Sequence, residues 1–541
     1  MTNTGGERAP SEPHAAAAWQ CALQRCSPSS QLGRAWRDGL ARNRAAPASV
    51  LRRLLDVGPG ERLPSGLVFR ELPEEVVEDW IAHPDWNVRK GLAERSMLDA
   101  RHRARLFRDP DPAHRWVFLT CAVDDRSELT DETFARLAAD PSPRVRAELA
   151  LHRDLPVRHL TALASDPAPE VRRAAAPRAW PHLDSSAQAA LRTDPDPGVR
   201  TAAVLRHHHC VPMPVDCFAG LPDDRHRERA AADCMLTRGL AESLVYGVGP
   251  TLRRAAAQNV RLHADLVARL GKDPDPAVRL LVSVRPDLTE AQRSRIAVEF
   301  DPSARCNPLP WVLALAADEA AVRRCAASAH PMLRRSVAWM EHLPPDVVAL
   351  LAHDDDWVVR LFLAERCSEA PPEVLLEMAR KWNGYSLVRI VNHPNFPRRH
   401  TLRYADDPDP RTRRLALMDP SSSAELVELF SKDSRPDVRR QALRDPRLSS
   451  DAVVRLLDDP DHGIRDTAAA DPRLPVHVVT ALLHRTATAC QAARNPAIPA
   501  VVMHRLLDQS RPVDGHGVRP SPPRTEEGAA LPPTADASGA A

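Results

Sequence analysis

The sequence predicts an all-α protein, a right-handed α-solenoid of about sixteen two-helix repeats of about 26 residues each. Two observations support this prediction. A seven-residue motif, Asp-Pro-x-Pro-x-Val-Arg, recurs along the chain at nearly regular intervals. Proline accounts for 52 of the 541 residues while aromatic residues account for only 4%, as expected when proline recurs at fixed positions of a repeat.

The motif is clearest in five copies. The aspartate that opens each copy and the arginine that closes it are Asp140 and Arg146, Asp166 and Arg172, Asp194 and Arg200, Asp273 and Arg279, and Asp459 and Arg465. Degenerate copies end at Arg89, Arg115, Arg229, Arg253, Arg305, Arg334, Arg360, Arg389, Arg413 and Arg439, and a last copy ends near Gln491. These positions set the predicted register of the repeats.

We divide the chain into three parts. Residues 1–35 form a polar N-terminal segment with a candidate capping helix, and residues 36–508 form the solenoid. Residues 509–541 form a tail rich in proline, alanine and glycine. The tail has few large apolar residues with which to build a core, so we expect it to be disordered.

Each repeat is expected to contain two short helices, as the unit at 155–175 illustrates. Its apolar residues recur at helical spacing, and they are Val157, Leu160, Leu163 and Ala164 in the first helix and Val171, Ala174 and Ala175 in the second. The Asp-Pro step between the helices supplies an N-cap carboxylate and a first-turn proline. Such short helices are unstable alone, so each repeat must bury its apolar edge against its neighbours.

The aspartate and the arginine of one motif lie six residues apart, and stacking would align them in columns along the solenoid. We interpret these columns as a hydrogen-bonded structural ladder. The alternative is a basic stripe that contacts phosphates, but each arginine comes with an aspartate that neutralises it.

The second half of each repeat carries a further pattern, seen in Asp445-Pro-Arg-Leu448, Asp471-Pro-Arg-Leu-Pro475 and Asn495-Pro-Ala-Ile-Pro499. Together with the seven-residue motif, it resembles the leucine-rich repeat variant family, which is itself similar to HEAT-type helical repeats. The resemblance covers roughly Trp36 to Leu507. It implies a curved solenoid of short helices that serves as a binding surface, and it implies little about activity.

No catalytic or cofactor-binding motif is found in the sequence, so we predict a non-enzymatic protein without a cofactor. Cys210, Cys217 and Cys234 are weak candidates for a metal site, because their separations exceed the two to four residues typical of zinc ligands. One branch of the resembling family carries a cysteine-ligated iron-sulfur cluster, and Cys21 and Cys26 invite the comparison. A cluster normally needs four cysteines, so we do not assign one.

The overall charge is nearly balanced, with 74 basic and 72 acidic residues, which argues against a dedicated nucleic-acid binder. A local basic run nevertheless offers an alternative contact with nucleic acid. It includes Arg398, Arg399, Arg403 and Arg413, with Phe396 and Tyr404 as candidate stacking residues. Asp406, Asp407 and Asp409 lie inside the same run and favour a solvated helix face.

The sequence therefore predicts a cytoplasmic protein-binding or scaffold protein with an unidentified protein partner. No signal peptide or membrane segment is recognisable, and the cysteines are irregularly spaced. The repeats are least regular at 201–260, 285–345 and 361–406, and irregular stretches of a repeat array are where a partner is expected to dock. The alternative is a DNA-interacting or base-repair protein of the HEAT-like repeat kind.

Overall fold

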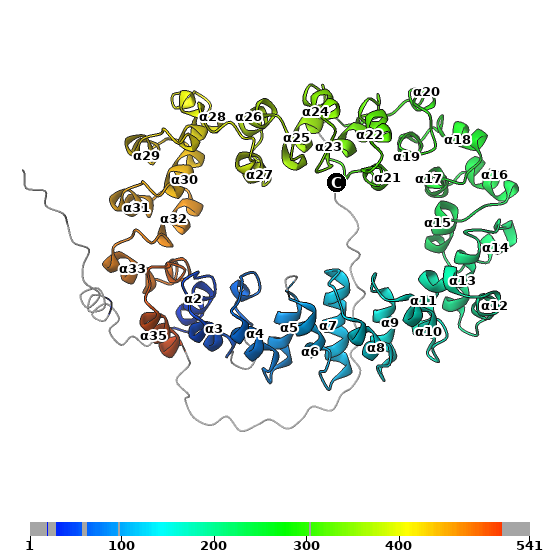
Figure 1. The fold of residues 1–541 in the computed structure, drawn as a ribbon, viewed down its shortest axis with the longest axis horizontal. Helices are drawn as coiled ribbons and strands as arrows, with labels where there is room; N and C mark the ends of the chain where they lie inside the picture. Colours follow the sequence, from blue (N-terminus) through cyan, green and yellow to red (C-terminus); the bar gives the residue numbers. More distant parts are fainter. Residues whose placement is uncertain (1–18, 20–28, 57–61, 96–97, 302–304, 511–541) are drawn as a thin grey trace, which may run out of the picture. The chain divides into compact units, whose positions relative to one another are not determined.

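A computed structural model describes Trp19 and residues 29–56, 62–95, 98–301 and 305–510. It confirms the all-α solenoid, because these residues form short helices in succession and no β-strand (Figure 1). The chain divides into two compact units: unit 1 is drawn from residues 1–122 and 399–540, and unit 2 from residues 123–398. Cys21, Cys26 and the tail from residue 511 onward lie outside the described residues.

Unit 1 contains the first and the last of the helices whose bounds the structure gives. Its N-terminal part consists of α2 (Ser30–Ala41), α3 (Ala48–Leu55), η1 (Ser65–Leu67), α4 (Glu74–Ile81), α5 (Trp86–Ala93), α6 (Ala100–Leu106) and α7 (Pro112–Asp124), whose last residues belong to unit 2. Its C-terminal part consists of η3 (Thr401–Tyr404), α28 (Pro410–Arg413), η4 (Arg414–Met418), α29 (Ala424–Phe430), α30 (Pro436–Arg444), α31 (Ser450–Leu456), α32 (His462–Ala469), α33 (Val476–Leu483), α34 (Ala489–Ala493) and α35 (Ala500–Ser510).

Unit 2 contains the helices between them. Its first half comprises α8 (Asp131–Ala138), α9 (Pro143–Leu151), α10 (Val157–Leu163), α11 (Pro169–Ala179), η2 (Trp180–His182), α12 (Ser185–Arg192), α13 (Pro197–His207), α14 (Val215–Ala219), α15 (Asp224–Asp233), α16 (Arg238–Tyr246) and α17 (Pro250–Gln258). Its second half comprises α18 (Ala264–Leu270), α19 (Pro276–Ser283), α20 (Glu290–Arg293), α21 (Pro310–Leu313), α22 (Glu319–Ala326), α23 (Pro331–Ala338), α24 (Pro345–Ala352), α25 (Trp357–Arg366), α26 (Pro372–Lys381) and α27 (Leu387–Asn392).

The repeated motif starts the second helix of each regular repeat. Its second proline is the first residue of the helix, as Pro197 is in α13, and the residue before it is the N-cap. In Asp194-Pro-Asp-Pro197 the second aspartate, Asp196, is that N-cap and accepts the Val199 N–H. The first aspartate accepts the N–H of Asp196 and shapes the turn. The N-cap is therefore two residues later than the sequence suggested.

The core of a regular repeat is formed by the second helices, which pack on one another from repeat to repeat, as α9, α11 and α13 do. In α11 the fully buried residues are Val171, Ala175, Ala176 and Ala179, whereas the predicted Ala174 is only partly buried. Small residues at these positions let the backbones of successive helices approach closely. Leu160 and Leu163 of α10 and its C-cap residue Ala164 are buried as predicted, but Val157, the first residue of the helix, is 46% exposed.

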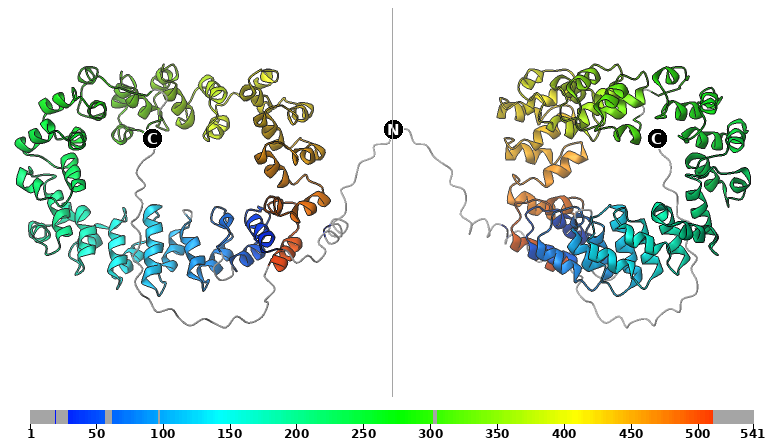
Figure 2. Two further views of the ribbon diagram at one scale, coloured as in Figure 1. Left: turned by 180° about the vertical axis from the view of Figure 1, so that it is seen from behind. Right: turned by 45° about the vertical axis from the view of Figure 1, so that its right-hand side comes forward.

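The first and last helices of unit 1 together complete one repeat. Helix α2 packs against α34 and α35, in the position that the second helix of a repeat takes elsewhere (Figures 1 and 2). The Trp36 indole N–H donates to the Leu483 carbonyl at 2.7 Å. The Asn43 amide donates to the carbonyls of Ala493 and Asn495, just as Asn259 donates to carbonyls of the repeat before it. Helix α2 crosses the boundary drawn at residue 35, and its inner face is buried like that of an internal helix.

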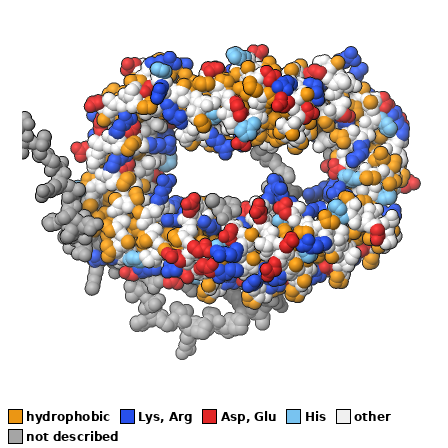
Figure 3. All heavy atoms as spheres, viewed as in Figure 1, with side chains coloured by type: hydrophobic (Ala, Val, Ile, Leu, Met, Phe, Trp, Pro, Cys, Tyr) orange, Lys and Arg blue, Asp and Glu red, His pale blue; other side chains and the backbone are white. Residues whose placement is uncertain are grey.

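Acidic and basic side chains are interspersed on the face of the molecule shown in Figure 3. Among the described residues, no helix is long and apolar enough to cross a bilayer.

Candidate functional site

The motif arginine binds within its own repeat and to the next one, as Arg172 shows. Its Nη1 donates to the carbonyls of Asp166 and Pro167 at the start of its own motif. Its Nε and Nη2 donate to the carboxylate of Asp194 in the following motif at 2.7 and 2.9 Å. The pair is largely shielded, with 15% of the arginine and 7% of the aspartate side chain exposed. The hydrogen bonds from Arg172 hold the pKa of the Asp194 carboxyl below its ordinary value.

The same arrangement recurs through both units. The ion pairs, with N···O distances of 2.5 to 2.8 Å, are Arg89–Asp109, Arg146–Asp166, Arg172–Asp194, Arg253–Asp273, Arg334–Asp354, Arg413–Asp433 and Arg439–Asp459. Arg200 and Arg465 donate to the carbonyls of Asp194 and Asp459 in their own motifs. The guanidinium groups of these pairs thus bind carboxylates of the solenoid itself.

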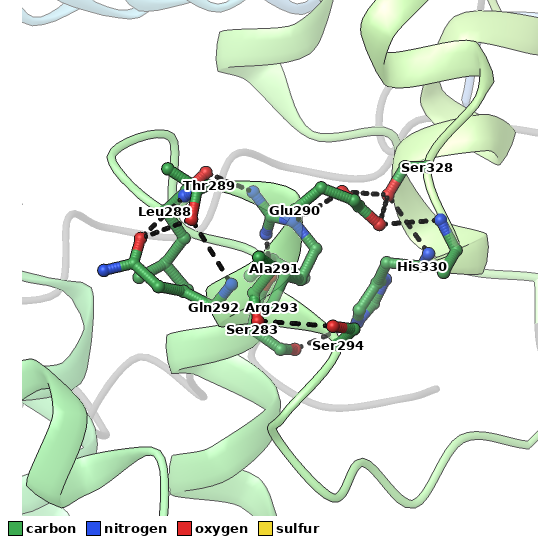
Figure 4. A network of polar contacts seen from close by, with 12 residues as sticks. Ser283, Leu288, Thr289, Glu290, Ala291, Gln292, Arg293, Ser294, Ser328 and His330 are labelled. Carbon is green, nitrogen blue, oxygen red and sulfur yellow. Dashed lines mark hydrogen bonds and ion pairs between the residues drawn. The ribbon is translucent and has the colours of Figure 1, made fainter.

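The ladder changes its partners around α20, where the repeats are irregular. Arg279 pairs with Glu299, whose side chain is 77% exposed. At the start of α23, Ser328 stands where the regular motif has its first aspartate. Glu290 of α20 supplies a carboxylate instead, since it accepts the Ser328 hydroxyl and the Ala329 N–H (Figure 4). A contact between more distant segments thus replaces the carboxylate that the motif lacks.

His330 is the N-cap of α23 and belongs to the same network (Figure 4). Its Nδ1 accepts the Met332 N–H, and its Nε2 lies 2.9 Å from the Ser283 hydroxyl oxygen. The Ser283 hydroxyl donates to the Leu280 carbonyl, so Nε2–H of a neutral imidazole is the donor in the contact with His330. Burial lowers the pKa of His330 to about 4.

Arg305 does not close a repeat, contrary to the register predicted from the sequence. The repeat at this place starts with Asn307-Pro-Leu-Pro310, and α21 begins at Pro310 with Val312 fully buried. Leu313 stands at the position where the motif has arginine. Arg305 was therefore wrongly predicted to be the last residue of a motif copy. Arg305 lies before this helix, without secondary structure, and its side chain reaches a later repeat.

The Arg305 guanidinium lies among three aromatic rings, which with Glu365 we call the arginine cage (Phe362, Glu365, Trp382 and Tyr385). Its Cζ lies 5.3 Å from the ring centroid of Phe362, 5.1 Å from that of Trp382 and 5.9 Å from that of Tyr385. Its Nη2 lies 2.7 Å from Oε2 of Glu365, whose side chain is only 3% exposed. The cage thus combines a buried carboxylate with aromatic walls.

Short-range contacts fix the shape of the cage. The Trp382 indole N–H donates to the Ser386 hydroxyl oxygen at 2.9 Å, and the Ser386 hydroxyl donates to Oε1 of Glu365. The Trp382 ring also folds over Gly384, where a Cβ atom would lie 2.1 Å from the ring. Only glycine leaves room for this ring position. Both oxygens of the carboxylate are therefore occupied, one by Ser386 and one by Arg305.

Further aromatic residues surround the cage. Trp339 contacts Phe362 edge to face with centroids 4.8 Å apart, and Trp357 lies 6.0 Å from Trp382. Arg366 lies over the Trp339 ring at 4.0 Å. This cluster was not among the sites predicted from the sequence, although three tryptophans within 339–382, in a chain with only 4% aromatic residues, could have indicated it. The pairing with Arg305, 60 residues from Glu365, was not readable from the sequence.

Of the cysteines considered as metal ligands, Cys217 packs against the hydrophobic cluster that contains Cys234, and Cys210 is not among the residues of that cluster. Cys210 is exposed, Cys217 is half-buried beside His208, and Cys234 is buried. The Cys234 thiol contacts the Leu205 carbonyl, and burial raises its pKa to about 12. A thiol that resists deprotonation is a poor metal ligand.

Among the described residues, the side chains of Glu74, Glu78 and His102 form one group in which the possible metal-ligand atoms lie within 4.8 Å of one another. Arg101 pairs with Glu74 and Arg105 with Glu78. The two partly exposed carboxylates are thereby neutralised by neighbouring arginines.

The basic residues considered for nucleic-acid contact are divided between the units, Arg398 in unit 2 and the others in unit 1. Arg413 is a ladder residue bound to Asp433. Arg398 donates to the Val391 carbonyl, and Phe396 beside it is only 4% exposed and so is not available to stack on bases. In unit 1, Arg399 and Arg403 line an open hollow together with Asp419, and Arg403 donates to the Tyr404 hydroxyl.

Comparison with known proteins found no matching family model and no matching curated protein. The resemblance to the leucine-rich repeat variant family therefore stays a prediction. Among solved structures, the chain is similar to a tumor overexpressed gene (TOG) domain array of microtubule polymerases, studied for tubulin recruitment and assembly. The two chains are 10% identical, the match covers 80% of this chain and 99% of that chain, and the TM-score is 0.21. It is also similar to the karyopherin Kap121p bound to the C-terminus of the phosphatase Cdc14p, with 14% identity over 74% of this chain and 49% of that chain and a TM-score of 0.17.

Proposed function

We propose that the chain is a non-enzymatic protein-binding or scaffold protein of the cytoplasm, and that it contacts its partner through the surface around the arginine cage in unit 2. The observation that carries the proposal is the concentration of tryptophan, tyrosine and arginine side chains there. These residue types dominate the binding energy of protein interfaces, because they combine a large contact area with polar groups.

The surface around the cage is accessible to a partner. Tyr385 is 85% exposed and Val388, on the following turn, is 56% exposed. Trp382 and Phe362 flank the same guanidinium as Tyr385; Trp382 is hydrogen-bonded to Ser386, and Phe362 is only 1% exposed. An exposed aromatic ring beside well-packed aromatic residues is the arrangement expected of a binding hot spot.

Nucleic-acid binding is the alternative function, and the contacts of the basic run do not favour it. Arg413 is engaged in the ladder, and Phe396 is buried. The alternative requires association with DNA that weakens steeply as salt increases.

The proposal is tested by purifying the tagged full chain from its native host, with and without nuclease, and identifying the bound molecules by mass spectrometry. We expect a near-stoichiometric protein that survives nuclease. Tyr385→Ala should reduce its recovery by about tenfold or more, as expected for a hot-spot residue. Tyr246→Ala is the matched control, since Tyr246 is also exposed (63%) but lies on α16. Nucleic acid that co-purifies and is lost with nuclease, or equal recovery with both variants, would overturn the proposal.

A further inference from the structure

The Arg305 side chain is held differently from the ladder arginines. Arg172 donates to two carbonyls and to both oxygens of a carboxylate. Within the described residues, Arg305 has one carboxylate oxygen and three aromatic rings as partners. A guanidinium has five N–H donors, so most of those on Arg305 are directed at ring faces or solvent. The group fits its site but is held by one charge-assisted hydrogen bond.

The cage itself does not depend on Arg305 for its shape. Trp382 is fixed by Ser386 and by the space over Gly384, and Phe362 is anchored in α25 with 1% exposure. Glu365 keeps its hydrogen bond from Ser386 whether or not Arg305 is present. Without a cation, however, a carboxylate buried to this degree is unfavourable. The buried carboxylate therefore requires a cation beside it, and the fixed aromatic rings already have the arrangement that accommodates a planar cation.

We propose that the arginine cage is a receptor for an arginine side chain of the partner protein, and that Arg305 occupies it in the free protein. This inference rests on the proposed function and specifies the group that is recognised. The partner's guanidinium takes over the hydrogen bond to Glu365 and stacks on Trp382 and Tyr385, while Arg305 moves into solvent.

The chemistry of the cage selects guanidinium over other cations. Arginine presents N–H donors in the plane of a flat cation, so one face can stack on a ring while an edge donates to the carboxylate. Lysine has a compact ammonium that is more strongly hydrated, and a quaternary ammonium has no donor for Glu365. Arginine is therefore the expected ligand.

The affinity of the cage for an arginine of the partner depends on how easily that arginine displaces Arg305. Because Arg305 is tethered, it competes at an effective concentration in the millimolar range, so a single arginine from outside binds weakly to the wild-type protein. A partner overcomes this competition through added contacts with the exposed Tyr385 and Val388. Removing Arg305 should strengthen binding rather than weaken it.

The test titrates the full chain with the peptides acetyl-Gly-Arg-Gly-amide and acetyl-Gly-Lys-Gly-amide, followed by calorimetry. We expect Arg305→Ala to bind the arginine peptide about tenfold or more tightly than the wild type, because the internal competitor is gone. The lysine peptide should bind Arg305→Ala about tenfold more weakly than the arginine peptide does. Adding Glu365→Gln, which leaves an oxygen for Ser386 to bond, should abolish the gain.

Arg305→Lys covers the case in which Arg305→Ala does not fold. It keeps a cation for Glu365 but lacks the planar group, so its affinity for the arginine peptide should fall between those of wild type and Arg305→Ala. Equal affinities for all of these proteins, or equal binding of the two peptides, would overturn the inference. If that occurs while partner recovery still depends on Tyr385, the surface binds a protein without an arginine receptor, and the proposed function stands alone.

Discussion

The repeats from α8 to α13 and those from α20 to α27 use the same kind of residues in different ways. In the first set, Arg146 and Arg172 each bind the carboxylate of the next motif. In the second set, Arg334 still binds Asp354, but Ser328 replaces a motif aspartate and donates to the Glu290 carboxylate, and Arg305 lies outside the motif and enters the arginine cage. Where the ladder is regular, arginine is a structural residue; where the ladder is interrupted, arginine takes part in a surface site.

The largest expected effect is on the regular set. Arg172→Ala leaves the largely buried Asp194 carboxylate without its cation, and we expect a loss of about 3 kcal/mol in the free energy of unfolding. Urea denaturation measures the loss. Arg158→Ala is the matched control, because Arg158 also bridges consecutive repeats, to Asp131, but the pair is exposed. It should cost less than about 1 kcal/mol. Equal losses would show that burial of the ladder does not matter.

The interrupted set should respond to acid through His330. Its pKa of about 4 in the folded protein lies below the ordinary value of 6.5, so the unfolded chain binds a proton more readily. The stability from the neutral imidazole is complete above pH 6.5 and is lost as the pH falls towards 4, by up to about 3 kcal/mol.

His330→Asn isolates this effect, because asparagine also caps helices but does not titrate. We expect the difference in unfolding free energy between the wild type and this variant to change between pH 6.5 and 4, the wild type losing more. Parallel pH profiles for the two proteins, measured by urea denaturation, would contradict the assignment.

The packing of α2 against α34 and α35 should contribute to stability as much as a contact between two regular repeats does. Asn43→Ala and Asn259→Ala each remove two hydrogen bonds to carbonyls of a neighbouring repeat, and each should cost about 2 kcal/mol. Hydrogen exchange should speed up in α2 for the first variant and in α17 for the second. No change in α2 on removing Asn43 would mean that the helix is not docked on α34.

The smallest expected effect on stability belongs to the cage surface. Because Tyr385 is 85% exposed, Tyr385→Ala should change the free energy of unfolding by no more than about 0.5 kcal/mol. A loss similar to that of Arg172→Ala would make Tyr385 a structural residue and remove it from the recognition surface.

The sequence predicted what is local and repeated. Proline at the first helical position and a buried valine two residues later follow from the motif itself, as Pro197 and Val199 show. The register failed at Arg305 because Leu313 replaces the arginine of the true motif. The completion of a repeat by α35 and α2 depends on contacts such as that from Asn43 to Ala493, 450 residues away, and no local pattern specifies it. The arginine cage likewise requires residues from separate repeats to meet.

The central claim is that stability and recognition depend on different residues of this chain. It is tested most directly by comparing recovery of the nuclease-resistant partner by Arg172→Ala and Tyr385→Ala under conditions in which both variants are folded. The account predicts that Arg172→Ala retains the partner at the wild-type level and that Tyr385→Ala loses it by about tenfold or more. Loss of the partner from Arg172→Ala with full retention by Tyr385→Ala would contradict the account.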